Sequence, residues 1–110
     1  MQTMTRGEGQ GVTGGTLTAT HLLDEEQLDG KCGMYARVSL TPGATLDLHR
    51  HEGNTETYYI LSGEGLYNDD GARELPARPG DVFFCEEGHS HAITATGDED
   101  LVFMALIINK

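Results

Sequence analysis

The sequence predicts an all-β domain, an antiparallel sandwich or barrel, from three observations. Glycine is frequent, with fifteen in 110 residues, and many of the glycines stand in short polar turns. Between the turns, Thr, Val, Ile and Leu recur in short runs, and several runs alternate with polar residues at the two-residue period of a half-buried strand. No apolar pattern at helical spacing lasts for more than about two turns. About nine short strands joined by glycine turns are typical of a sandwich or barrel.

The elements follow in chain order. Residues 1–15 contain five glycines and little that is apolar, so we expect a flexible arm there and a single barrel domain over 16–110. Asp24 begins a weak capping-box pattern, which predicts a helix of one or two turns that ends by Gly30. The segment Asn68-Asp69-Asp70-Gly71 is the strongest hairpin signal. Apart from the two strands of this hairpin, the expected strands cover about residues 16–23, 34–40, 44–51, 56–62, 82–85, 90–96 and 101–108.

The last expected strand has an unusual pattern, because it is apolar at both parities. Leu101, Phe103 and Ala105 share one face, while Val102 and Met104 share the other. A small barrel covers only one face of a strand with its own core. We therefore expect a second subunit to cover the outer face, in a homodimer.

Charge and hydropathy exclude several classes of function. Eighteen acidic residues against seven basic ones give a net charge of -11, which argues against nucleic-acid and anionic-membrane partners because both need clustered Lys and Arg. No apolar run approaches the roughly 18 residues that a membrane span needs. The N-terminal residues lack the charged start and following apolar stretch of a signal peptide, so we expect none. We expect a cytoplasmic protein with reduced thiols.

The histidines carry the clearest chemical signal. Four of the five lie in two close pairs, His49 with His51 and His89 with His91. Side chains two residues apart on a strand point to the same face, about 7 Å apart, so His49 and His51 can bind one ion together. A turn at residues 53–54 would bring Glu56 back beside His51 on the adjoining strand. A further histidine from a distant strand would complete three nitrogen ligands and one oxygen ligand.

These residues resemble a known family pattern. From Gly43 the sequence reads G-A-T-L-D-L-H-R-H-E-G-N-T-E-T-Y-Y-I-L-S-G, which is similar to the first cupin motif at each fixed position and spacing. From Gly80 it reads G-D-V-F-F-C-E-E-G-H-S-H, which resembles the second cupin motif. Two positions depart from that second motif: Glu86 stands where the family has Pro, and Ala95 stands where it has Asn.

The cupin resemblance spans about residues 33–108 and implies a double-stranded β-helix, a jelly-roll barrel with one metal ion bound inside. Carried over residue by residue, it implies that His49, His51, Glu56 and His91 are the ligands. The implied ion is one divalent transition metal per chain, Fe, Mn, Zn or Ni. Three histidines and one glutamate leave room for two waters or a bidentate ligand, which suits Lewis-acid or redox chemistry.

Two further residues are candidates for a catalytic role. His89 shares its parity with His91, so it either faces the pocket as a proton carrier or lies at the mouth without a function. Tyr58 has the parity of Glu56, so it either lines the cavity or only packs in the core.

Four other side chains have a simpler interpretation. Tyr35 and Arg37 share a parity that could reach the interior, where Arg37 would bind a carboxylate, but a solvated face is the simpler interpretation. Cys32 and Cys85 have no activating partner in the sequence, so we treat both as free thiols.

Three functions fit this pattern. The first is a metal-dependent enzyme that acts on a small polar metabolite, because the family resemblance includes dioxygenases, decarboxylases, isomerases, epimerases and lyases. The second is a non-catalytic module that binds or senses a small molecule through the metal. The third, an interaction protein with a vestigial site, is disfavoured because none of the four ligands is missing.

Overall fold

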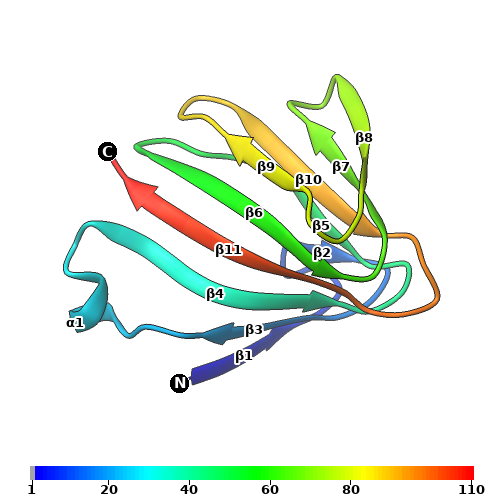
Figure 1. Ribbon diagram of the computed structural model, residues 1–110, viewed down its shortest axis with the longest axis horizontal. Coiled ribbons are helices and arrows are strands. Elements are labelled where there is room, and N and C mark those ends of the chain that lie inside the picture. The colour runs from blue at the N-terminus through cyan, green and yellow to red at the C-terminus, as the bar shows by residue number, and fades with distance from the viewer. Residues whose placement is uncertain (1) are drawn as a thin grey trace.

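A computed structural model describes residues 2–110, and its strands form two antiparallel sheets that face each other (Figure 1). The six-stranded sheet has the order β1 (Gln2–Arg6), β3 (Leu17–His21), β4 (Cys32–Leu40), β11 (Leu101–Asn109), β6 (Asn54–Ser62) and β9 (Val82–Cys85). The five-stranded sheet has the order β2 (Val12–Thr13), β5 (Thr45–Arg50), β10 (Ser90–Ala95), β7 (Gly65–Asp69) and β8 (Arg73–Ala77). The all-β barrel expected from the sequence is confirmed.

The core fills the space between the sheets. Tyr58 and Ile60 of β6 and Phe103 of β11 point inward from one sheet, and Ile93 of β10 points inward from the other; each is at most 1% exposed. Tyr58 and Ile60 are two residues apart on β6, so they share the inward face, as the alternating pattern requires. Burial of each such side chain stabilises the fold by about 1.5–3 kcal/mol. The same inward faces carry the candidate site residues at one end of the barrel.

β11 is central in its sheet, between β4 and β6 (Figure 1). Its inward residues Phe103 and Ala105 are buried in the core. On its outward face, Met104 is half-buried and Ile108 is 43% exposed. The two-sided apolar pattern of this strand therefore places a partly exposed apolar strip on the outside of the sheet.

The N-terminal segment differs from the flexible arm expected over residues 1–15. β1 pairs with β3 from Gln2 opposite His21 to Arg6 opposite Leu17, and β2 pairs with β5. Val12 of β2 is fully buried. The segment looks polar because β1 lies at the edge of its sheet, where backbone hydrogen bonds hold a strand whose side chains stay in water. Met1 lies outside the described residues.

Two local predictions are confirmed. The helix α1 (Glu25–Leu28) begins with a capping box, in which the backbone N–H of Gln27 donates to Asp24 Oδ1 at 2.8 Å. The expected hairpin joins β7 and β8, and Asp70 and Gly71 take positive φ values of 59° and 75° there, as a tight hairpin turn with two left-handed residues requires. Among the described residues, no helix is long and apolar enough to cross a membrane.

Candidate metal centre

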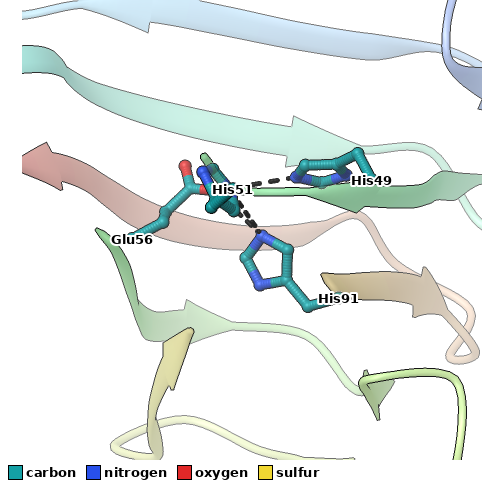
Figure 2. A group of neighbouring side chains, drawn as sticks. All are labelled: His49, His51, Glu56 and His91. Atoms are coloured by element: carbon teal, nitrogen blue, oxygen red, sulfur yellow. Dashed lines mark hydrogen bonds and ion pairs between the residues drawn. The ribbon is translucent and has the colours of Figure 1, made fainter. Parts of the chain in front are cut away.

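Four side chains converge between the two sheets (Figure 2). They are the four that the sequence pattern singles out: His49, His51, Glu56 and His91. Each offers one ligand atom, and these atoms all lie within 4.8 Å of one another. Residues from three separate parts of the chain thus meet at one point.

Strand register accounts for three members of the cluster. β5 and β10 are neighbours in the five-stranded sheet, and their register sets His49 directly opposite His91. His51 lies just past the end of β5. It is fixed there because its N–H donates to the carbonyl of His89 at 3.0 Å and its carbonyl accepts from the N–H of Gly88 at 2.7 Å. The loop before β10 therefore holds His51 in place, while the pairing of β5 with β10 positions His49.

Glu56 reaches the cluster by a different path from the one the sequence predicts. We expected it beside His51 on an adjoining strand, but that prediction is wrong, because β5 and β6 belong to different sheets. The chain crosses from one sheet to the other at residues 51–53, where Gly53 takes a φ of 76°. Glu56 then points inward from the six-stranded sheet and meets the histidines across the interior.

The cluster is tight and mostly buried. Glu56 Oε1 lies 2.9 Å from His51 Nε2, 3.0 Å from His91 Nε2 and 3.7 Å from His49 Nε2. The Nε2 atoms of His51 and His91 are 3.0 Å apart. His91, Glu56 and His51 are 1%, 3% and 6% exposed, and the side chain of His49 is 36% exposed. One side of the cluster therefore remains open, next to His49.

Hydrogen bonds at Nδ1 orient the three imidazole rings. His49 Nδ1 donates to the backbone carbonyl of Asp47 at 2.7 Å, and His51 Nδ1 donates to Asn54 Oδ1 at 2.7 Å. His91 Nδ1 lies 3.0 Å from the hydroxyl of Tyr67. An imidazole that donates from Nδ1 keeps a lone pair on Nε2 when it is neutral. Two Nε2 lone pairs, those of His49 and His51, therefore converge with the carboxylate of Glu56. Such an arrangement of electron-pair donors suits a bound cation.

Sequence reasoning missed these orienting partners. The sequence pattern predicts only a turn at Asn54 and gives no signal for Tyr67. Asn54 stands three residues after His51, which is close enough for an amide to reach its ring. Tyr67 approaches through the pairing of β7 with β10, and pairing between distant strands leaves no local sequence signal.

The electrostatics of the cluster favour a bound cation. Burial acts to raise the pKa of Glu56, but hydrogen bonds from His49, His51 and His91 outweigh burial and hold the pKa well below its usual range. The hydrogen bond with Glu56 raises the pKa of His51, against the effect of burial. Burial lowers the pKa of His91, against the attraction of Glu56. The carboxylate therefore stays ionised at neutral pH, beside one imidazole that favours its neutral form.

The two catalytic candidates lie in different places. Tyr58 lines the site: its ring stacks on His91 with centroids 4.7 Å apart, and its hydroxyl is 3.4 Å from His91 Nε2. Burial raises the pKa of Tyr58 well above its usual value, so the hydroxyl keeps its proton. His89 lies in the turn before β10, outside the strand, so the parity argument does not apply to it. Its half-exposed ring faces Asp70 at 3.4 Å and Glu86 at 4.0 Å, in a separate surface hollow.

The four other side chains considered from the sequence, Tyr35, Arg37, Cys32 and Cys85, do not belong to the metal cluster. Arg37 is exposed on the outer face of β4, opposite Met104 of β11, and Tyr35 shares that face. Both cysteines are free, as expected. Cys85 is buried on β9 opposite Glu56, and burial together with the charge of Glu56 raises its pKa to about 11.

A cavity of about 380 Å³ opens onto the cluster. His49, His51, Glu56 and Tyr58 form its polar end. Apolar side chains of β3, β4, β5 and β11 form most of its remaining walls, and Arg6 of β1 also lines it. The volume lies within the roughly 300–1,000 Å³ that is usual for small-molecule sites. A ligand can therefore approach the four residues from within the barrel.

The fold and the cluster define a class of protein: a jelly-roll barrel with a three-histidine, one-glutamate site inside. The model of the cupin domain family matches residues 36–107. This chain belongs to the cupin family. An oxalate-binding protein of Thermotoga maritima is 46% identical over 94 residues, which cover 86% of this chain and 77% of that protein.

Two further comparisons agree with this assignment. A crystal structure of a predicted oxalate decarboxylase from Thermotoga maritima matches with a TM-score of 0.91 and 41% identity, over 98% of this chain and 92% of the other. The oxalate decarboxylase of Bacillus subtilis is 35% identical over 75 residues, which cover 64% of this chain and only 20% of that enzyme. The chain therefore corresponds to one small part of the larger enzyme.

Proposed function

We propose that this protein holds one divalent transition metal at His49, His51, Glu56 and His91 and binds a small carboxylate at the open positions of the metal. One observation carries the proposal: three Nε2 atoms and one carboxylate oxygen lie within 4.8 Å of one another, and each Nδ1 atom has a partner of its own. Iron, manganese, zinc and nickel are all compatible with such ligands.

The spacing of the ligand atoms supports an ion of higher coordination. Ligands about 2.1 Å from an octahedral ion are separated by about 3.0 Å when they occupy adjacent positions. Three distances in the cluster, among His51, His91 and Glu56, are 2.9 Å to 3.0 Å. His49, at 3.7 Å from Glu56, would complete four of six positions with a small shift of its more exposed ring. Two positions would remain for water or a bidentate ligand.

The charge of the centre supports a carboxylate ligand. A divalent ion with one glutamate ligand carries a net charge of +1, in a protein whose total charge is -11. That local positive charge attracts an anion to an otherwise acidic molecule. The names of two relatives, an oxalate-binding protein and an oxalate decarboxylase, make oxalate the first ligand to test.

We propose that the bound ligand is also a substrate. When bound, the metal supplies Lewis-acid polarisation of the carboxylate. The chain's own contribution is to keep water away from the buried side of the site, where His51, Glu56 and His91 lie, and to donate a hydrogen bond from Tyr58, whose hydroxyl stays protonated. Within this scheme Tyr58 is a donor and not a base. A module that only binds its ligand is the alternative, and the name of the oxalate-binding relative favours it.

The test combines binding and turnover on one preparation. The purified protein is loaded anaerobically with each of the four metals, and oxalate binding is measured by calorimetry. The same samples are then assayed for carbon dioxide, formate and oxygen uptake. Oxalate binding that requires metal supports the proposed site, and product formation supports an enzyme. Binding without any product on any metal would favour the binding module, and no binding of oxalate or of a longer chelating acid on any metal would contradict the proposal.

We also propose a homodimer formed through the outer face of the six-stranded sheet. Tyr59 of β6, Val82 and Phe84 of β9 and Ile108 of β11 all point outward there and are 43% to 60% exposed. Large apolar side chains that gather on one sheet face mark an interaction surface. A second copy of the chain would bury the same strip on both subunits, as a two-fold interface requires.

A further inference from the structure

Arg6 is the one lysine or arginine that lines the cavity within the described residues. It is the last residue of β1, pairs with Leu17 of β3 and is half-buried. The other titratable side chains of the cavity wall are Asp47, Tyr58 and three members of the metal cluster, His49, His51 and Glu56. A single guanidinium among apolar walls is a recognition feature, because few precisely placed polar groups set the specificity of such pockets.

The guanidinium of Arg6 has no anionic partner in the part of the chain that the structure describes. The ion pairs there do not include it, although the chain has eighteen acidic residues. Its side-chain hydrogen bond is a long one of 3.4 Å to the carbonyl of Gln10. Asp47 also lines the cavity, but its carboxylate accepts from the hydroxyl of Thr13 at 2.8 Å. Arg6 therefore retains hydrogen-bond donors for a ligand.

The backbone connects Arg6 to the metal centre. Gly11 has a φ of 79° and comes so close that a Cβ there would lie 3.4 Å from Arg6 Nη1. The carbonyl of Gly11 accepts from the N–H of Asp47, and the carbonyl of Asp47 accepts from His49 Nδ1. The guanidinium is thus held against the same edge of the barrel that orients His49. Arg6 is half-buried and lines the cavity.

We propose that Arg6 binds a second anionic group of the ligand, so that the cavity selects a dianion longer than oxalate. The inference rests on the proposed function, because the first carboxylate is placed at the metal. A two-carbon ligand would occupy only a small part of a cavity of about 380 Å³. The apolar walls between the two polar ends fit a short hydrocarbon spacer. Arginine suits the far end because its planar fork pairs with a carboxylate through two parallel hydrogen bonds.

The test uses matched pairs of 2-oxo acids on the metal-loaded protein. 2-Oxopentanoate and 2-oxopentanedioate have the same chelating end and chain length, and differ only in the distal carboxylate. The seven-carbon pair, 2-oxoheptanoate and 2-oxoheptanedioate, tests a longer spacer between the metal-binding end and the distal carboxylate. Affinities are measured by calorimetry for wild type, Arg6→Gln and the control Arg37→Gln, whose side chain is exposed on the outer face. Metal content and circular dichroism confirm that each variant is folded and loaded.

The expected result is that wild type and Arg37→Gln prefer the dianion by about tenfold in at least one pair, and that Arg6→Gln loses this preference while its affinity for the monoanion is unchanged. An Arg6→Gln variant with the wild-type preference, or a wild type with no preference, would overturn the inference. Oxalate serves as the separate check on the proposed function. If oxalate binds while the preference is absent, only the role of Arg6 fails; if no chelating acid binds, the proposed function fails as well.

Discussion

Glu56 and His91 belong to different sheets, yet Glu56 Oε1 lies 3.0 Å from His91 Nε2. Glu56 is on β6 of the six-stranded sheet, and His91 is on β10 of the five-stranded sheet. A cation bound between them would join the two halves of the barrel. Binding of such a cation would therefore be coupled to stability, because the ligand geometry exists only when both sheets are in place.

The first prediction concerns metal removal. At a free metal concentration of about 100 times Kd, binding to the folded state alone adds about 2.7 kcal/mol to the free energy of unfolding. For a domain of this size, that corresponds to a rise in Tm of about 10–20 °C. Differential scanning calorimetry with metal and with EDTA measures the shift. A Tm that is the same with and without metal would contradict a site shared by both sheets.

The second prediction concerns pH. The pKa of His51 is raised in the metal-free protein, mainly by its hydrogen bond with Glu56. The protonated pair therefore stabilises the metal-free fold fully below pH 6.5, the ordinary histidine value, and this contribution is lost as pH rises through the raised pKa. A metal must displace that proton, so its affinity should fall by up to about tenfold per pH unit below the raised value. Metal titrations at pH 8 and pH 5.5 measure this, and equal affinities would be inconsistent with His51 as a ligand.

The third prediction concerns Asn54, which orients His51 through its Nδ1 atom. Asn54→Ala removes the acceptor and should weaken metal binding by about 10- to 100-fold. Asn54→Asp keeps an acceptor oxygen and should retain most of the affinity. Competition with a chromogenic chelator measures both variants. Equal affinity in the Ala variant and wild type would remove Asn54 from the account of the site.

The fourth prediction concerns the thiol of Cys85. Its pKa is raised to about 11, first by burial and then by the negative charge of Glu56. At pH 8 only about one molecule in a thousand would carry the thiolate, which is the reactive form. Iodoacetamide should therefore modify Cys85 slowly in the folded protein and fast in urea, as followed by mass spectrometry of peptides. Rapid labelling of the folded protein would show that the thiol is activated.

The fifth prediction concerns the proposed dimer. Phe84 is 55% exposed on the outer face of β9, so Phe84→Glu would place a charge in the proposed interface. The variant should be a monomer by light scattering at micromolar concentration, with its metal content unchanged. A charge reversal at an exposed position outside the surface hollow that Phe84 lines, Glu74→Lys on β8, should remain dimeric. A monomeric wild type would contradict the proposed interface.

Local sequence patterns predicted the strands from β3 onward, and together with the cupin resemblance they predicted the members of the cluster. The alternation in β4, the Asn-Asp-Asp-Gly turn and the capping box at Asp24 depend on residues close in sequence, so they could be predicted from the residues themselves. The position of Glu56 could not, because the turn after His51 serves equally well for a hairpin and for a crossing between sheets. Only the packing of the two sheets distinguishes these paths.

The N-terminal strands and His89 show two other limits. β1 consists of polar residues at a sheet edge, where pairing relies on the backbone and leaves little trace in the side-chain pattern. The glycine-rich composition therefore suggested an arm. The parity argument placed His89 with His91, but the strand begins only at Ser90, and parity has no meaning before a strand begins.

The most direct test of the central claim is the metal content of three purified proteins, measured by elemental analysis after identical loading and desalting. His21 is a histidine outside the cluster, so His21→Ala is the matched control for His51→Ala. The account predicts one divalent ion per chain in wild type and in His21→Ala, and a large loss of metal in His51→Ala. Full metal content in His51→Ala would contradict the account. So would folded wild-type protein that contains no metal after the same loading treatment.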